Sequence, residues 1–313
     1  MAKKISILLP VFNEAKNVSA ITHAVQNIFS NQPDYDFEIL FVDDGSHDNT
    51  LEEIILLTNQ FPNIFYISFS RNFGKDNALL AGFRHCKGDA VITMDADLQH
   101  PPEIILQLIQ HWENGYEIVY CYRENKNIHR GPISVFFSYL FYKIMNQLSD
   151  VKLENGISDF RLMNSKVINT LVNLPEDHPF FRGLVKWIGY KQLGIPYTPN
   201  SRNAGDSSYK MKTLLKLATH GITSFSTKPL NIAIYLGFFF SILSVLYIPY
   251  AIISKLMGYA VSGWASVIVT IAFFGGINLM ILGVVGVYLG KTFMQGKHRP
   301  QYIISETNMQ SKL

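Results

Sequence analysis

Carboxylate and amide side chains recur in this sequence directly after short runs of β-forming residues. Carboxylates that lie close together repel one another unless a cation or hydrogen-bond donors hold them. Carboxylate and amide oxygens are also the ligands that Mg²⁺ and Mn²⁺ prefer when phosphate and water complete the shell. These residue types therefore indicate a site for a divalent metal or for a nucleotide that carries one. The residues are Asn13 and Glu14, Asp43 and Asp44, and Asp95, Asp97 and Gln99.

For these side chains to meet, the runs before them must be strands of one sheet. Short β-forming runs alternate with helical patterns, which predicts an α/β fold with a mainly parallel sheet and helices on both faces. Such sheets bind ligands beyond the carboxyl ends of their strands, where the polar residues lie. The predicted strands are 5–9, 37–42, 64–69, 90–94 and 117–122, and the predicted helices are 15–29, 49–60, 75–85 and 102–113.

Other phosphate, metal and nucleic-acid signals do not compete with this interpretation. The sequence has no Gly-x-Gly-x-x-Gly after a strand, no Gly-Lys-Ser/Thr phosphate loop and no zinc-type spacing of Cys and His. Its two cysteines, Cys86 and Cys121, form no disulfide framework, so we expect both to be reduced and buried. A net charge of +3 is too small to indicate a nucleic-acid partner.

The C-terminal part of the chain is far more apolar than the rest. Between Asn231 and Gly290 the only charged residue is Lys255. The charge-free runs 232–253 and 265–289 are each long enough to cross a hydrocarbon core of about 30 Å as a helix, so they predict a transmembrane hairpin. Lysine and arginine concentrate outside the connecting loop, and the positive-inside rule therefore places everything except that loop in the cytoplasm.

Two further segments have the pattern of amphipathic helices. In 132–150 the apolar residues fall on one helical stripe, which suits either a helix on the membrane surface or one packed on the domain core. In 209–230 the stripe is edged by Lys210, Lys212 and Lys216, which is typical of a helix in the lipid headgroup layer. Membrane lipids are therefore expected partners of this chain.

Four motifs follow one another in the polar part of the chain: Pro10-Val11-Phe12-Asn13-Glu14, Val42-Asp43-Asp44-Gly45-Ser46, Arg71-Asn72-Phe73-Gly74-Lys75 and Asp95-Ala96-Asp97-Leu98-Gln99-His100-Pro101-Pro102. Their order and spacing resemble those of the inverting glycosyltransferases of family 2. Within that family the chain is most similar to the polyprenyl-phosphate glycosyltransferases, which include dolichyl-phosphate mannose synthases and bacterial bactoprenol glucosyltransferases. The resemblance extends to Ser158-Asp159-Phe160-Arg161-Leu162 and to the two-helix tail, and it implies a GT-A fold for the polar part.

The resemblance also implies roles for the residues that match. One departure concerns the stretch 202–210, where Ser208 stands at the position of a family lysine, so that Lys210 could take over its role. Asp159 and Asp95 are the expected catalytic residues, and Asp159 would face the acceptor. The expected donor-binding residues are Pro10, Glu14, Asp43, Asp44, Lys75 and Asp95; those for Mg²⁺ or Mn²⁺ are Asp97, Gln99 and Asp95; and those for acceptor phosphate are Arg123, Arg130, Arg202 and Lys210.

The activity that the resemblance implies is inverting transfer of a hexose, glucose from UDP-glucose, to undecaprenyl phosphate. The place would be the cytoplasmic face of a bacterial inner membrane, and a homo-oligomer such as a tetramer is suggested. A lipid phosphate is already anionic near neutral pH, so Asp159 could orient groups rather than remove a proton. Positive side chains must offset the repulsion between acceptor and donor. Lys126 and Arg130 are either such side chains or solvated loop charges, and Arg161 could equally be an ion-pair partner of Asp159.

Two other functions share part of this pattern. A processive polysaccharide synthase has the same nucleotide-binding motifs, but it would need more spans and a Gln-x-x-Arg-Trp motif, which this sequence lacks. A non-enzymatic membrane adaptor or flippase subunit would explain the hairpin but not the carboxylates after the strands. The domains expected for the enzyme are a catalytic domain at 1–208, a juxtamembrane segment at 209–230, two transmembrane helices within 231–290, and a cytoplasmic tail at 291–313.

Overall fold

The structure, a computed structural model, describes residues 2–123, 156–176, 179–200, 226–258 and 263–309. The described residues belong to two compact units. The first unit holds the described residues up to 200 together with 300–309, and the second holds 226–258 and 263–299. The proposed surface helix 132–150, and 209–225 of the juxtamembrane segment, lie outside the described residues.

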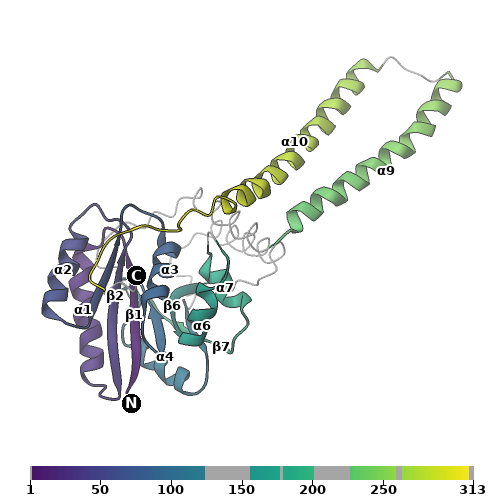
Figure 1. Ribbon diagram of the computed structural model, residues 1–313. Coiled ribbons are helices and arrows are strands. Elements are labelled where there is room, and N and C mark those ends of the chain that lie inside the picture. Colours follow the sequence, from purple (N-terminus) through teal and green to yellow (C-terminus); the bar gives the residue numbers. More distant parts are fainter. Residues whose placement is uncertain (1, 124–155, 177–178, 201–225, 259–262, 310–313) are drawn as a thin grey trace. The chain divides into compact units, whose positions relative to one another are not determined.

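The first unit is an α/β domain, as the alternating pattern predicted (Figure 1). Each of the five predicted strands and four predicted helices is present, with ends within two residues of those expected. Its strands are β1 (Lys3–Val11), β2 (Tyr35–Asp43), β3 (Ile64–Phe69), β4 (Ala90–Thr93), β5 (Ile118–Arg123), β6 (Ile157–Asn164), β7 (Gln192–Tyr197) and β8 (Ile304–Thr307). Its helices are α1 (Ala15–Ser30), α2 (Thr50–Gln60), α3 (Lys75–His85), α4 (Ile104–Glu113), α6 (Ser165–Val172) and α7 (Phe181–Trp187).

The strands of the first unit form one mixed sheet in the order β7-β5-β6-β4-β1-β2-β3-β8. The central strands β4, β1, β2 and β3 are mutually parallel, so their carboxyl ends share one edge. Strand β6 runs antiparallel to β4, with Thr93 paired to Arg161. The first residues of β6 therefore lie beside the last residues of β4, which brings Asp159 to the same edge.

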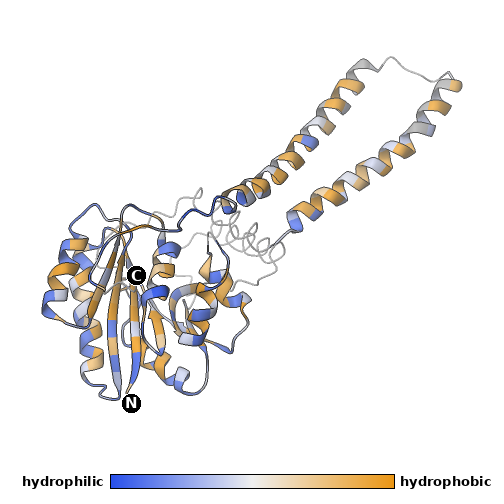
Figure 2. Ribbon diagram, viewed as in Figure 1, coloured by the Kyte–Doolittle hydropathy of each residue, from blue (hydrophilic) through white to orange (hydrophobic). Residues whose placement is uncertain are grey.

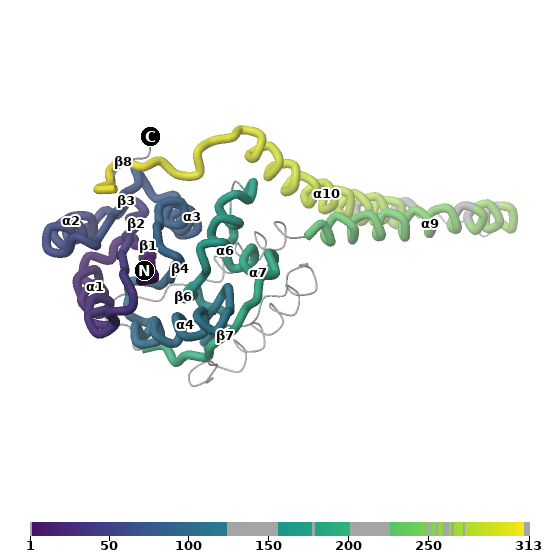
Figure 3. The backbone as a smooth tube through the Cα atoms, turned by 60° about the horizontal axis from the view of Figure 1, so that its bottom comes forward, coloured from purple at the N-terminus to yellow at the C-terminus, as the bar shows by residue number. Residues whose placement is uncertain are grey.

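Helices cover both faces of the sheet, and side chains alternate between the two faces along the strands. Ile5, Ile7 and Leu9 of β1 are fully buried in a core that also contains α1, α2 and α4. Helix α3 packs on the opposite face, and a Cβ at Gly82 would come within 2.1 Å of a Leu8 methyl group, so any larger residue there would force Leu8 to shift. Figure 3 shows α1 and α4 on one side of the strands and α3 and α6 on the other.

The sequence did not predict that residues after the apolar hairpin would extend the sheet. Strand β8 pairs antiparallel with β3 at its edge. Tyr302 stacks on Phe69 with ring centroids 5.1 Å apart, and the Tyr66 hydroxyl donates to Glu306 at 2.7 Å. Four residues with little apolar alternation give no strand signal of their own, because an edge strand is specified by its neighbour.

The second unit consists of helices α9 (Lys228–Leu256) and α10 (Trp264–Gln295). Both contain stretches long and apolar enough to cross a membrane, 228–254 and 266–295, and the windows that qualify have no buried residues. The predicted runs 232–253 and 265–289 lie inside these helices, and α10 continues for six residues beyond the second run. Figure 2 shows apolar residues along most of the length of both helices, which is typical of a membrane span.

Candidate functional site

The loops after β1 and β2 are fastened to each other at the carboxyl edge of the sheet. The Asn13 side chain accepts from the His47 backbone N–H at 2.8 Å, and the Asn13 N–H donates to the Ser46 hydroxyl at 2.9 Å. The Glu14 N–H donates to the Thr50 hydroxyl at 2.8 Å. Pro10 lies near the end of β1 and is partly buried. The two loops therefore form a prearranged surface in which the predicted donor-binding residues are fixed.

Asp43 and Asp44 are both buried, but they have different partners. Asp43 accepts from the Ser46 N–H at 3.0 Å and from the Ser68 hydroxyl at 2.9 Å. Asp44 accepts from the backbone N–H groups of Phe73 and Gly74 at 2.6 and 2.9 Å. Burial raises the pKa of Asp44, although these two N–H groups oppose the shift. Asp44 thus holds the loop before α3 in place, which is a positioning task in addition to the predicted contact with the donor.

The loop after β4 carries the predicted metal residues. The Asp97 carboxylate accepts from the Gln99 N–H at 3.2 Å, and Leu98 between them has a positive φ of 59°, a conformation that a non-glycine residue adopts rarely. The Gln99 side-chain oxygen accepts from Arg123 at 3.0 Å, and Arg123 also donates to the Tyr197 hydroxyl at 3.2 Å. Arg123 is therefore joined to the loop after β4.

His100 holds the loop after β4 in place through hydrogen bonds to Asp95 and Ser158, a role that the sequence did not reveal. Its ring is fully buried and stacks on Phe160. The Asp95 N–H donates to Nδ1 at 3.0 Å, so the proton of the neutral ring lies on Nε2, which bonds the Ser158 hydroxyl at 2.7 Å. Burial lowers the pKa of His100 and outweighs the Asp95 carboxylate, which would raise it. The ring is therefore neutral at physiological pH.

The centre of the site is a cluster of charges around Asp159. The Lys75 ammonium bridges two carboxylates, at 2.5 Å from Asp95 and 2.9 Å from Asp159. Arg182 grips Asp159 with two parallel bonds, Nε to Oδ1 at 2.9 Å and a terminal nitrogen to Oδ2 at 2.7 Å. Arg161 lies 3.5 Å from Asp159, as the ion-pair alternative for it predicted. The two oxygens of Asp159 thus face four cationic N–H contacts.

The charges decide the protonation state of both carboxyl groups. Burial alone would raise the pKa of Asp159, but Lys75, Arg182 and Arg161 together hold it well below its usual range. Burial would also raise the pKa of Asp95, but the nearby Lys75 ammonium outweighs burial, and the pKa is lowered. Asp159 is therefore a firmly ionised carboxylate whose lone pairs are already occupied, and such a group is a poor general base at neutral pH.

Asp76, next to this cluster, behaves in the opposite way. It accepts from the Phe181 N–H at 3.4 Å, and burial, reinforced by Asp159, raises its pKa to about 6 against the attraction of Arg182 and Lys75. The folded state thus favours the protonated form. Stability is lost as pH rises from the ordinary carboxyl pKa of about 4 through 6.

Replacing this carboxyl group should therefore stabilise the domain at neutral pH. The amide of Asp76→Asn keeps an acceptor for the Phe181 N–H and never ionises. We expect thermal unfolding to shift upward by about 2–4 °C at pH 7.5, and by less at pH 4.5. The exposed residue Asp34 supplies the control, Asp34→Asn, which we expect to leave thermal unfolding close to that of wild type. An equal shift of Asp76→Asn at both pH values would contradict the assignment.

The described residues account for most, but not all, of the predicted site. Lys75, Asp95 and Asp159 are brought into one cluster, with Asp97 and Gln99 on the adjoining loop. Arg130, Arg202 and Lys210, and also Lys126, lie outside the described residues. Arg182 was missed because the sequence Phe180-Phe181-Arg182 contains no spacing that distinguishes it from a surface arginine.

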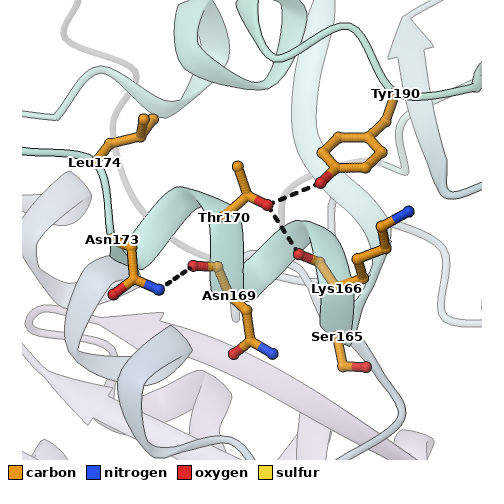
Figure 4. Close-up of a pocket in the computed structure, with 7 residues that line it drawn as sticks. All are labelled: Ser165, Lys166, Asn169, Thr170, Asn173, Leu174 and Tyr190. Carbon is orange, nitrogen blue, oxygen red and sulfur yellow. Dashed lines mark hydrogen bonds between the residues drawn. The ribbon is translucent and has the colours of Figure 1, made fainter.

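A separate polar concavity lies on α6, away from these carboxylates. Figure 4 shows the Thr170 and Tyr190 side chains directed toward each other, and their hydroxyl groups are 2.8 Å apart. The side chains that line it include amides and a lysine but no carboxylate. Because metal and diphosphate chemistry needs the charged groups described above, this surface is not the candidate active site. Its lining residues are Ser165, Lys166, Asn169, Thr170, Asn173, Leu174 and Tyr190.

Comparisons with known proteins agree with the geometry. Residues 6–172 match the model of glycosyl transferase family 2. The bactoprenol glucosyl transferase of Shigella phage SfV is 40% identical over 302 residues, covering 96% of this chain and 98% of that protein. The prophage bactoprenol glucosyl transferase homolog of Escherichia coli K12 is 39% identical, with the same coverage. The uncharacterized glycosyltransferase YkcC of Bacillus subtilis 168 is 38% identical, covering 96% of this chain and 93% of that protein.

Proposed function

Because the chain belongs to glycosyl transferase family 2 and is a glycosyltransferase, we propose that it transfers glucose from UDP-glucose to undecaprenyl phosphate. The observation that carries this proposal is the similarity to bactoprenol glucosyl transferases, which extends over nearly the full length of both proteins and includes the apolar helices. The site itself supports a sugar-nucleotide donor, since its carboxylates, amides and cations suit a nucleoside diphosphate with a metal.

In this proposal the donor lies along the edge of the central strands. Glu14 and Asp43, on the fastened loops after β1 and β2, bind the nucleoside, and Pro10 shapes the wall beside them. Asp95 follows β4, the neighbour of β1 in the sheet, and Lys75 reaches it from the start of α3, so both would lie beside the diphosphate. The buried bonds of Asp43 to Ser46 and Ser68 keep its carboxylate in one orientation, which reduces the ordering that donor binding requires.

The residues of the β4 loop fit a divalent metal. Among the described residues, no three or more His, Cys, Asp or Glu side chains form a closed metal site. Mg²⁺ and Mn²⁺ in nucleotide sites do not need one, because one or two carboxylates suffice when phosphates and water supply the other ligands. Asp97, assisted by Gln99 and Asp95, would hold the ion. When bound, it neutralises the charge that develops on the leaving diphosphate.

The chemistry is a single displacement at the anomeric carbon. An oxygen of the acceptor phosphate forms a bond to that carbon as the bond to the UDP oxygen breaks, and the electron pair leaves with UDP. The acceptor is already an anion, so no proton has to be removed, in keeping with the occupied lone pairs of Asp159. One displacement inverts the configuration and gives a β-linked lipid phosphate sugar from an α-linked donor.

The apolar helices supply the reason for a lipid acceptor. Removing a polyprenyl chain from a bilayer costs about 0.8 kcal/mol per CH₂ group, so the reaction must occur at the membrane surface. Helices α9 and α10 would anchor the enzyme there as a two-span hairpin, with the catalytic domain in the cytoplasm. The proposed segments 132–150 and 209–230 would lie in the headgroup layer.

The proposal is tested by presenting the full-length protein, in detergent micelles, with undecaprenyl phosphate and a panel of radiolabelled UDP and GDP sugars. We expect transfer of one glucose per lipid from UDP-glucose, and loss of transfer when a chelator is added. Preference for another sugar would overturn the donor assignment. A growing polymer would indicate a processive synthase, and no transfer from any donor would overturn the proposed acceptor.

A further inference from the structure

Arg182 is the residue of the charged cluster that no motif assigned. It lies at the start of α7, a helix that does not follow any of the central parallel strands. Its two parallel bonds to Asp159 have the fork geometry in which an arginine is most firmly oriented. Its side chain is nevertheless 41% exposed, whereas that of Asp159 is 9% exposed. A buried carboxylate therefore holds an accessible guanidinium in a fixed position.

We infer that Arg182 binds the phosphate of the lipid acceptor, and that Asp159 is the anchor for this guanidinium. The inference rests on the proposed function and adds a residue to it. The fork leaves 41% of the Arg182 side chain exposed, so an anion can reach the guanidinium from solvent. Bidentate recognition of a phosphate is a task for which arginine is better suited than lysine. Lys75, also partly exposed and bonded to Asp159, provides a second cation beside it.

The order of strands indicates which phosphate Arg182 meets. Along the carboxyl edge, the predicted nucleoside residues lie at the ends of β2 and β1, the predicted metal loop follows β4, and Asp159 is the third residue of β6. In an in-line displacement the acceptor approaches the sugar from the side opposite to the leaving diphosphate. The nucleoside end lies toward β2, so the acceptor approaches from the side of β6, where Asp159 holds Arg182.

The cluster also explains why an ionised Asp159 is useful without being a base. Two carboxylates, Asp95 and Asp159, are in contact with three cations, Lys75, Arg161 and Arg182. Arg161 is buried and therefore structural, while Lys75 and Arg182 have exposed parts. Without Asp159, the two accessible cations would repel each other and lose their fixed separation. With it, an anionic phosphate meets positive charge that is already in position.

The experiment measures donor and acceptor kinetics separately with the full-length protein, UDP-glucose and undecaprenyl phosphate in micelles. The variant Arg182→Gln should lower kcat/KM for the lipid about 10- to 100-fold and change the KM for UDP-glucose less than about twofold. Arg182→Lys keeps the charge but not the fork, so its kcat/KM for the lipid should lie between those of Arg182→Gln and wild type. The matched control is Lys186→Gln on the same helix, whose ammonium contacts the Tyr120 hydroxyl instead; we expect it to resemble wild type.

Each result either supports or overturns the assignment. Equal losses for donor and acceptor in the Arg182 variants, or no loss, would overturn it. If thermal unfolding shows that Arg182→Gln does not fold, the same comparison of donor and acceptor kinetics is made with Arg182→Lys. Wild-type enzyme that transfers no sugar to the lipid would overturn the proposed function itself, whereas active wild-type enzyme with unaffected Arg182 variants overturns only this inference.

A double-mutant cycle tests the role of Asp159. If Asp159 acts through Arg182, the double variant Asp159→Asn with Arg182→Gln should lose no more acceptor kcat/KM than the worse of the two single variants. If Asp159 were an independent base, the two losses would multiply. Multiplying losses would therefore overturn the anchoring role.

Discussion

Asp97→Ala is expected to reduce sugar transfer about 10²–10³-fold while the protein still inserts into membranes. Asp97 is the predicted metal ligand of the loop after β4, and a carboxylate there would hold a divalent ion against the diphosphate. Its removal leaves the developing negative charge on the leaving group without that ion. The measurement is transfer from UDP-glucose as a function of Mn²⁺ or Mg²⁺ concentration, together with recovery of the protein in the membrane fraction.

The matched control for this substitution is Asp34→Ala. Asp34 is an exposed residue just before β2, at the opposite end of that strand from Asp43. We expect this variant to keep wild-type activity and metal dependence, because no described site residue lies at that end. Full activity of Asp97→Ala, or of wild type with excess chelator, would contradict the metal role.

Asp159→Asn is expected to damage both folding and catalysis. The substitution removes the charge that pairs with the buried Arg161 and with the fork of Arg182. Leaving a buried cation without its partner costs about 3–5 kcal/mol, so we expect a clear decrease in the free energy of unfolding. Transfer should fall about 100-fold or more in the fraction that stays folded. The measurements are chemical denaturation and acceptor kinetics.

The pH dependence gives an independent check on Asp159. Because its pKa is lowered, the stability that it contributes is fully present above the ordinary carboxyl pKa of about 4, and it is lost only as pH falls below that value. Wild-type transfer should therefore show no acid limb from Asp159 between pH 5 and 8. The control for the stability loss of Asp159→Asn is Glu113→Gln, which breaks the surface ion pair with Lys3. It should lower the free energy of unfolding by about 1 kcal/mol or less. If Asp159→Asn and Glu113→Gln lowered the free energy of unfolding equally, the buried charge cluster around Asp159 would be contradicted.

The parts of the site that the sequence predicted are those that local patterns determine. Strand runs followed by turn residues placed Asp43 and Asp95 at strand ends, and parallel pairing then brought those ends to one edge. Lys75 could be named because its loop follows β3 directly. The contacts of Lys75 with Asp95 and Asp159 could not be predicted, since they depend on how far α3 approaches the sheet.

The parts that the sequence did not predict come from distant segments. Arg182 reaches Asp159 from a helix 23 positions later in the chain, and no periodic pattern links the two. The hydrogen bonds of His100 to Asp95 and Ser158 depend on burial of the ring against Phe160, which a motif of polar residues does not reveal. Three-dimensional contacts therefore decided which charged residues support the site.

Strand β8 imposes an order on the assembly of this protein. Synthesis proceeds from the N-terminus, so β3 leaves the ribosome long before residues 304–307, and both apolar helices emerge in between. Until then the outer edge of β3 has unpaired backbone N–H and C=O groups, which are prone to join strands of other chains. The last strand of the sheet is therefore added only after both apolar helices have been synthesised, and until then the edge of β3 can pair with strands of other chains.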